Sequence, residues 1–350
     1  MSAITGARLE RITSSPRFRD GAFRNTAPVG PGLKGNPLPI MGEYFFGTEV
    51  RVPKASLPVI DPREGWARRV DTGFRMTWLG HSTVLLELDG LKVLTDPVFG
   101  LRASPMRFAG PKRFHPVPVT IAQLPRLDAV LLSHDHYDHL CRDTMKELAS
   151  MEVPIVTALG VGAHLERFGI AAKRITELDW HQSHELGGVR FTAQPAQHFS
   201  GRGLHDRNST LWASWVIQTN QHKVFFSGDT GLTEEFRDIG KAHGPFDLVM
   251  LEVGAWNEAW GDIHLGPKNA LQAFDMLGGG TLFPVHWGTF NLALHAWDEP
   301  AETLLANQGS RRIITPRLGL PVEPRTLEGV TPWWREVGAE RVKSLTPESA

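Results

Sequence analysis

The sequence predicts an α+β fold in which packed β-sheets carry helices on their outer faces. Two observations favour this class. Between residues 74 and 96, apolar residues alternate with others and Asp89-Gly90 marks a hairpin turn, which is typical of antiparallel strands. Beyond Asp128, short apolar stretches alternate with helix-like stretches. No linker or short repeat interrupts residues 70–320, so we expect all these elements to share one core.

The expected elements follow one another along the chain. The first three strands are expected at "FRMTWL", "TVLLEL" and "LKVLTD". The later strands are expected at "AVLLS", "PIVTA", "KVFFSGD", "LVMLEV" and "TLFPVH". The helices that alternate with them are expected at "TMKELASM", "GAHLERFG", "EEFRDIGKAH" and "PKNALQAFDML". Because strand ends hold side chains on a rigid scaffold, a site is indicated by the polar residues that end three of these stretches, His134, Asp229 and His286.

The N-terminal part of the chain differs in composition from the rest. We expect residues 1–65 to form a partly mobile N-terminal extension and residues 66–350 to form a single domain. Residues 1–26 carry five arginines against two acidic residues and lack a clear hydrophobic period, which predicts a mobile arm; a lipid- or partner-binding arm is the alternative. Residues 27–61 are rich in proline and glycine, which favours an extended segment draped over the domain.

Charge and composition narrow the partners and the compartment. The net charge of −1 gives no global electrostatic reason to bind nucleic acid or an anionic membrane, so we expect no nucleic-acid partner. The chain contains no signal peptide and no apolar run of about 18 residues, which predicts a cytoplasmic protein; peripheral contact with a membrane stays open. The single cysteine, Cys141, excludes an internal disulfide and is expected to be a small buried residue.

Three histidines and two aspartates fall within six residues of the stretch "LLSHDHYDHL". Imidazole nitrogens and carboxylate oxygens at this density suit a first-row metal ion. In an extended chain the side chains of His134 and His136 point the same way, whereas Asp138 and His139 belong to the following turn. One short loop could therefore serve two neighbouring metals. A solvated polar loop with incidental histidines is the alternative interpretation.

Three further residues of ligand type follow at His198, Asp229 and His286. Taken in order after the H-x-H-x-D-H motif, they resemble the ligand series of the metallo-β-lactamase fold superfamily. The resemblance implies a four-layer αββα sandwich with its site at one edge of the two sheets. It also implies two divalent metal ions, with Zn²⁺ as the first choice, although iron or manganese suits the same ligands. The implied ligands are His134, His136 and His198 for one metal, and Asp138, His139 and His286 for the other, with Asp229 bridging.

Longer stretches resemble one branch of that superfamily, the branch that contains N-acylphosphatidylethanolamine-hydrolysing phospholipase D. They include "TWLGHSTVLLELDGLKVLTDPVF", "GPKRF", "LDAVLLSHDHYDHL", "GDTG" and "HWGTF". This resemblance implies a phosphodiesterase, a lipid or other small-molecule substrate and a homodimer. His264, in "GDIHLGPKNAL", matches a histidine beside the metals in that branch, which implies a role towards the phosphate or the leaving group. A polar residue at the entry of a helix is the alternative for His264.

The implied chemistry is hydrolysis by a water that two metals bind and deprotonate. The chain contains no G-x-S-x-G elbow, P-loop or G-x-G-x-x-G fingerprint, which argues against serine-hydrolase, nucleotide-phosphate and dinucleotide sites. We expect Asp138 to orient the attacking water in addition to its ligand role. A carbonyl hydrolase, such as a lactonase, thioesterase or β-lactamase, is the alternative function, and a metal-binding protein without turnover is the third.

Two residues outside the ligand set are expected to support it. Metal-bound histidines need an acceptor for their second nitrogen, and Asp96 is the expected carboxylate; a simple Asp-Pro turn is the alternative. His81 is expected to border the site or to be a buried, hydrogen-bonded histidine. Four aromatic residues near strand ends could wall an apolar cleft or belong to the core: Trp256, Trp260, Trp287 and Phe290.

Overall fold

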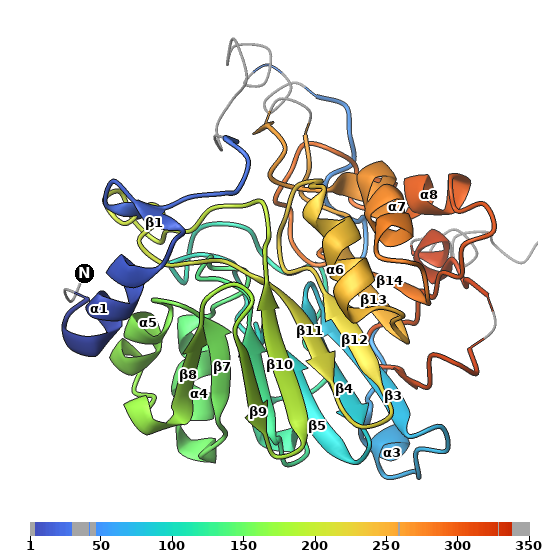
Figure 1. Cartoon of the computed structure of the whole chain (residues 1–350). Helices are drawn as coiled ribbons and strands as arrows, with labels where there is room; N and C mark the ends of the chain where they lie inside the picture. Colours follow the sequence, from blue (N-terminus) through green and yellow to red (C-terminus); the bar gives the residue numbers. More distant parts are fainter. Residues whose placement is uncertain (1–3, 30–41, 43–46, 258–259, 328, 338–350) are drawn as a thin grey trace, which may run out of the picture.

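The protein forms two β-sheets that lie face to face, with helices on their outer sides (Figure 1). The computed structural model describes residues 4–29, 42, 47–257, 260–327 and 329–337. Residues 30–41 and 43–46 of the proline- and glycine-rich stretch expected to be extended lie outside the described residues. The predicted α+β class and the four-layer αββα arrangement are confirmed.

The first sheet has seven strands in the order β15-β3-β4-β5-β6-β7-β8. Its first part is the predicted antiparallel meander, in which β3 pairs with β4 and β4 with β5. From β5 to β8 the neighbours are parallel, because helical connections return the chain to the same end of the sheet. The strands are β3 Phe74–Gly80, β4 Thr83–Leu88, β5 Leu91–Thr95, β6 Ala129–Leu132, β7 Ile155–Ala158, β8 Ile175–Leu178 and β15 Pro321–Val322.

The second sheet has six strands in the order β14-β13-β12-β11-β10-β9. β12, β13 and β14 are parallel, and the remaining neighbours are antiparallel. The edge strand β9 alternates exposed and half-buried residues and depends on pairing with β10, so its apolar pattern is too weak to predict it. The strands are β9 Ser183–Leu186, β10 Val189–Gln194, β11 Ser214–Gln218, β12 Lys223–Phe226, β13 Leu248–Glu252 and β14 Leu282–Val285.

The helices lie on the two outer faces of the sandwich (Figure 1). Four of them are the helices predicted between strands, namely α4 Arg142–Leu148, α5 Gly162–Arg167, α6 Glu235–His243 and α7 Gly266–Met276. The others are α1 Gly6–Ser14, α3 Arg63–Trp66 and α8 Glu299–Ala306, with 3₁₀ turns at Ile121–Gln123, Ala149–Met151, Ala172–Arg174 and Trp333–Glu336. No helix in the described part of the chain is long and apolar enough to cross a membrane.

The N-terminal segment packs on the domain. Arg8, in α1, forms ion pairs with Glu166 and Glu177 at 2.8 Å and 2.7 Å, and Ile12 is buried. The short strands β1 Phe18–Arg19 and β2 Ala22–Phe23 form a separate hairpin. The mobile arm predicted for residues 1–26 stays a prediction; in the structure, specific contacts of α1 and the buried side chain of Ile12 attach residues of this segment to the domain.

A cluster of buried tryptophans packs between the two sheets and includes residues from the C-terminal part of the chain. Trp78 of β3 lies 5.9 Å from Phe283 of β14 in the opposite sheet, as measured between ring centroids, and 5.4 Å from Trp287. Trp333 and Trp334 are also buried, and Trp333 lies 6.4 Å from Trp78. Trp333 and Trp334 therefore contribute to the core from the C-terminal part of the described residues.

We expect Trp333→Ala to lower the free energy of unfolding by about 3–5 kcal/mol, since it leaves a cavity between buried aromatic rings. The measurement is urea denaturation followed by circular dichroism. Arg335→Ala is the matched control: Arg335 pairs with Glu302 at the surface, where solvent screens the pair, so its loss should leave the free energy of unfolding almost unchanged. Equal stability of Trp333→Ala and the unmodified protein would contradict the packing role.

Candidate metal centre

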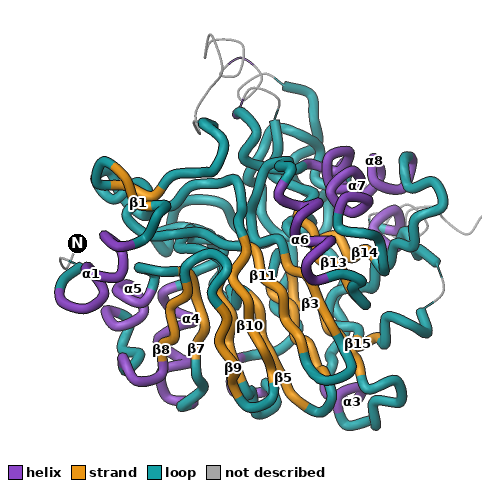
Figure 2. The backbone as a smooth tube through the Cα atoms, in the orientation of Figure 1, coloured by secondary structure: helices purple, strands orange, loops and turns teal. Residues whose placement is uncertain are grey.

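The predicted ligand residues come together where the loops leave one end of both sheets. The loop after β6 carries His134 to His139, the loop after β10 carries His198, and Asp229 and His286 follow β12 and β14. Figure 2 shows these loops gathered at one end of the strands. The strand ends thus deliver side chains from four separate parts of the chain to one place.

Three residues of this edge have left-handed backbone angles, which non-glycine residues adopt at a cost. The φ angles are 53° at His81, 32° at Asp96 and 65° at His286. Such strain persists only where the surrounding structure fixes it, and it gathers at functional sites. The backbone here is therefore held in place to aim these side chains.

The first ligand group contains His134, His136, His198 and Asp229. Their ligand atoms all lie within 4.8 Å of one another. The His136 Nδ1 atom is 2.9 Å from His134 Nε2 and 3.2 Å from His198 Nε2. Asp229 Oδ2 is 3.7 Å from the Nε2 atoms of both His134 and His198. Three nitrogens and one oxygen thus face a common point, as in a four-coordinate metal site.

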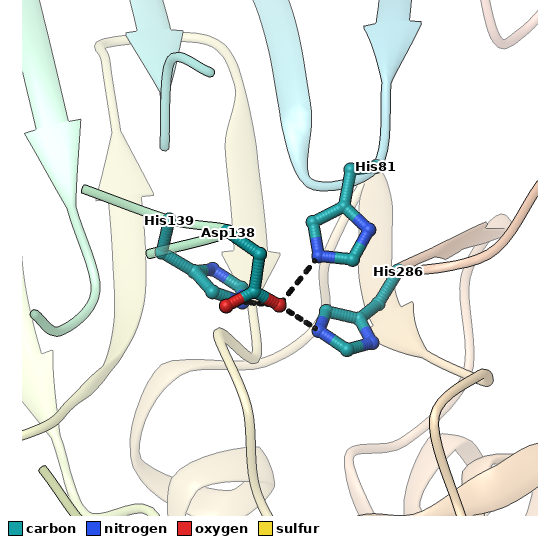
Figure 3. Close-up of side chains that lie close together, drawn as sticks. All are labelled: His81, Asp138, His139 and His286. Atoms are coloured by element: carbon teal, nitrogen blue, oxygen red, sulfur yellow. Dashed lines mark hydrogen bonds and ion pairs between the residues drawn. The ribbon is translucent and has the colours of Figure 1, made fainter. Parts of the chain in front are cut away.

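The second ligand group surrounds Asp138 (Figure 3). Asp138 Oδ2 lies 3.0 Å from His81 Nε2, 3.2 Å from His286 Nε2 and 3.5 Å from His139 Nε2. His81 was expected beside the ligand set, but its ring nitrogen is as close to Asp138 as those of the two predicted ligands. The alternative interpretation of His81, a buried and hydrogen-bonded histidine, also agrees with this position.

Asp229, a member of the first group, also lies close to two histidines of the second. In addition to the contacts above, its Oδ2 atom lies 3.1 Å from His139 Nε2 and 3.2 Å from His286 Nε2. One carboxylate oxygen is therefore within 4 Å of four imidazole nitrogens. This is the position that a ligand shared by two metal ions would take.

The donor set fits metal ions better than it fits hydrogen bonding alone. Among the described residues, no hydrogen-bond partner is found for His139 Nε2 or Asp229 Oδ1, although both atoms are buried. A buried polar atom without a partner costs about 1–3 kcal/mol. Coordination to a metal would satisfy these atoms, and imidazole with carboxylate is the ligand type that zinc, iron and manganese accept.

Burial and charge set the protonation of the cluster. Burial lowers the pKa of His134 and His198 well below the usual range, so both rings are neutral and keep a free lone pair. Burial alone would also lower the pKa of His286, but the Asp229 and Asp138 carboxylates raise it to about 10. A metal ion that binds here takes the place of the proton on His286.

Asp96 holds the outer side of His139. Its Oδ2 atom lies 2.7 Å from His139 Nδ1, and its carboxylate accepts hydrogen bonds from the backbone N–H and the hydroxyl of Ser133. Because Nδ1 is engaged, Nε2 is the nitrogen that faces Asp229 and Asp138. Asp96 thus lies where the sequence analysis expected an outer acceptor.

Glu252, which was not predicted, lies at the end of β13 and is fully buried. Its Oε2 atom is 2.7 Å from His264 Nδ1, and its Oε1 atom accepts the backbone N–H of Thr230. The ring of His264 lies 5.0 Å from that of His198 and 5.5 Å from that of His286. The signal was present in "LVMLEV": a carboxylate ends a buried strand, as Asp229 and His286 follow theirs.

Of the four aromatic residues considered for an apolar cleft, one lies in the core and another lies beside the metal centre. Trp287 is buried between Trp78 and Trp333 in the core. Phe290 packs with a small cluster that contains Cys141, and its ring lies 5.4 Å from that of His81. Cys141 is buried, as expected. Trp256 and Trp260 are half-buried.

Comparison with known proteins identifies the family. Residues 92–287 match the family model described as "Beta-lactamase superfamily domain". An uncharacterised protein of Mycobacterium tuberculosis is 46% identical over 331 residues, which cover 92% of this chain and 88% of that protein. The N-acyl-phosphatidylethanolamine-hydrolyzing phospholipase D 1 of Caenorhabditis elegans is 39% identical over 232 residues, which cover 63% of this chain and 65% of that protein.

Solved structures support the same fold. The isothiocyanate hydrolase from Delia radicum gut bacteria superposes with a TM-score of 0.58 at 22% identity, covering 71% of this chain and 98% of that chain. At this identity the likeness concerns the fold and not the substrate. The chain is therefore a member of the metallo-β-lactamase superfamily and a metal-dependent hydrolase of that superfamily.

Proposed function

We propose that this protein is a binuclear metal phosphodiesterase of phospholipase D type that acts on N-acylphosphatidylethanolamine-like lipids. The observation that carries the proposal is the position of Asp229 Oδ2 within 4 Å of histidine nitrogens from both ligand groups, in a chain 39% identical over 232 residues to a phospholipase D of that class. A cytoplasmic homodimer with peripheral contact to the membrane that holds its substrate accords with this proposal.

Two groups of residues would hold the metals. His134, His136 and His198 would bind one ion and Asp138, His139 and His286 the other, with Asp229 between them. When bound, two divalent ions, Zn²⁺ by preference, supply an activated water and neutralise charge on the phosphate. Other side chains of the protein would orient the water and protonate the leaving group.

In this proposal Asp138 orients the attacking water. Its side chain is only about one-seventh exposed, and His81 and His286 hold its Oδ2 atom. This leaves Oδ1 to accept a hydrogen bond from the water whose oxygen attacks phosphorus. A carboxylate fixed in this way contributes through position as well as through charge.

In this proposal His264 protonates the leaving group. Glu252 engages its Nδ1 atom at 2.7 Å, which leaves Nε2 as the nitrogen that can face a substrate. In the reaction, the water adds its oxygen to phosphorus, the bond from phosphorus to the alcohol oxygen breaks, and His264 gives a proton to that oxygen. The products are a phosphatidic acid and an N-acylethanolamine.

The proposal is tested by metal content and substrate preference together. Mass spectrometry of the purified protein should give about two metal ions per chain. The same preparation should release N-acylethanolamine from a synthetic N-acylphosphatidylethanolamine, and removal of metal by a chelator should abolish this until zinc is returned.

Bis-p-nitrophenyl phosphate, a lactone and nitrocefin serve as comparison substrates. Faster turnover of the lactone or nitrocefin would replace the phosphodiesterase with a carbonyl hydrolase, and no turnover of any substrate by fully metallated protein would favour a binding protein.

Asp138→Asn should reduce turnover by at least about 100-fold, because an amide is a poorer ligand and a poorer proton acceptor than a carboxylate. Metal content is measured in the same variant. Loss of turnover with both metals retained would assign Asp138 to the water as well as to the metal. Undiminished turnover would contradict both roles.

Asp96→Asn should weaken metal binding by about 10- to 100-fold, since the amide N–H₂ would oppose the N–H of His139. Competition with a fluorescent chelator measures the affinity. Asp128→Asn is the matched control, because Asp128 accepts the backbone N–H of Lys92 at the opposite end of the same sheet. Equal affinity in the two variants would remove Asp96 from the support of the metal centre.

A further inference from the structure

A second cavity lies beside the metal centre and has a different character. It encloses about 620 Å³, which is within the range of ligand pockets. Its walls come from the loop after β5, the start of α4, the end of α5 and the loop after β10. Tyr137 lines it, whereas its neighbours His136 and Asp138 belong to the metal groups. The cavity and the metal centre therefore share one loop but involve different side chains of it.

Positive charge is concentrated in this cavity although the whole chain has a net charge of only −1. Five arginines line it against two aspartates. The arginines are Arg102, Arg107, Arg142, Arg167 and Arg202.

The two aspartates leave most of this charge unbalanced. Asp143 pairs with Arg107 at 3.1 Å. Asp206 instead accepts the backbone N–H groups of Arg202 and Gly203, at 3.1 Å and 2.7 Å. An anion that entered the cavity would thus meet guanidinium groups not already neutralised.

Three of the arginines have guanidinium N–H groups that are available to a ligand. Arg142 and Arg167 are exposed and form no ion pair with any residue in the described part of the chain. The Nε atom of Arg102 is buried, and no hydrogen-bond partner is found for it among the described residues. Guanidinium groups match phosphate oxygens in pairs, so a cavity of this composition suits a phosphate better than a metal or a neutral ligand.

Exposed apolar side chains lie on the loops that line the cavity. Leu101 and Met106 line the cavity and are 57% and 46% exposed. Phe108, in the same loop, is 82% exposed, and Leu204, in the loop of Arg202, is 94% exposed. Large apolar residues with this exposure, set beside cationic ones, are typical of a surface that receives an amphiphile.

Arg202 connects the cavity to the metal-binding loop. Its guanidinium donates hydrogen bonds to the carbonyl oxygens of Asp135 and Leu140, and it stacks over the ring of Tyr137 at 4.1 Å. The Tyr137 hydroxyl in turn donates to the carbonyl oxygen of Arg202. Arg202 therefore fixes the wall between the two sites, and Arg142 and Arg167 are left for a ligand, together with the Nε atom of Arg102, whose Nη1 donates to the carbonyl oxygen of Gly110.

We infer that this cavity is a second, non-catalytic site that binds the phosphate group of an anionic amphiphile, with its apolar part against the exposed side chains of the rim. The inference does not depend on which bond the metal centre hydrolyses. The phosphate can come from a soluble amphiphile or from a lipid in a bilayer, and the two sources share the chemistry that the arginines recognise.

The test is calorimetric titration of the fully metallated protein with octyl phosphate, together with co-sedimentation with phosphatidylcholine vesicles that contain dioleoylphosphatidic acid. In Arg142→Ala/Arg167→Ala, binding should weaken by at least about tenfold, since each lost guanidinium removes a charge-assisted hydrogen bond to phosphate. Loss of octyl phosphate binding alone would identify a soluble ligand, and loss of vesicle binding would identify a lipid headgroup; both support the site.

The matched control is Arg126→Ala/Lys173→Ala, which removes the same charge from exposed residues outside the cavity. It should bind as the unmodified protein does, and both double variants should keep their metals and hydrolyse bis-p-nitrophenyl phosphate at the same rate as that protein. Equal binding by the two double variants would overturn the inference, and so would octyl phosphate binding that chelation of the metals abolishes and the arginine substitutions leave unchanged.

Discussion

The structure depends on one buried carboxylate oxygen that four imidazole nitrogens approach. Asp229 Oδ2 lies 3.1–3.7 Å from ring nitrogens of His134, His139, His198 and His286. His134 and His198 are neutral, whereas the nearby carboxylates raise the pKa of His139 and His286, and His139 Nε2 and Asp229 Oδ1 are buried without a hydrogen-bond partner among the described residues. Coordination to metal ions would satisfy these atoms, and the surrounding fold must hold the residues in the arrangement that metals require.

The fold meets this requirement because the ligands follow strand ends and hydrogen bonds hold the far side of the histidine rings. Asp96 fixes His139, Glu252 fixes His264, and the backbone carbonyl of Ile263 contacts Nδ1 of His198. Left-handed backbone angles at His81, Asp96 and His286 are part of the same arrangement. The hydrogen bonds around these residues offset the cost of the unfavourable angles.

Segments remote from the motifs also take part in the support. The side chain of Asn25 donates to the backbone carbonyl of His198 and accepts from its backbone N–H, at 2.8 Å and 3.0 Å. Trp333, near the other end of the chain, completes the core between the sheets beside Trp287, which directly follows His286. The metal edge is thus stabilised by parts of the chain that carry none of its ligands.

The sequence by itself determined the class of the fold, most of its strands and helices, and the residues that gather at one edge. It could do so because the strands of the core are short and apolar, and because the H-x-H-x-D-H motif places several ligand types within one turn. The contacts of His81 with Asp138 and of Glu252 with His264 appear only in the folded chain. The tertiary structure also placed the N-terminal segment on the domain and gathered five arginines around one cavity. These contacts join residues far apart in the chain, and local periodicity and propensity carry no information about which distant segments will meet.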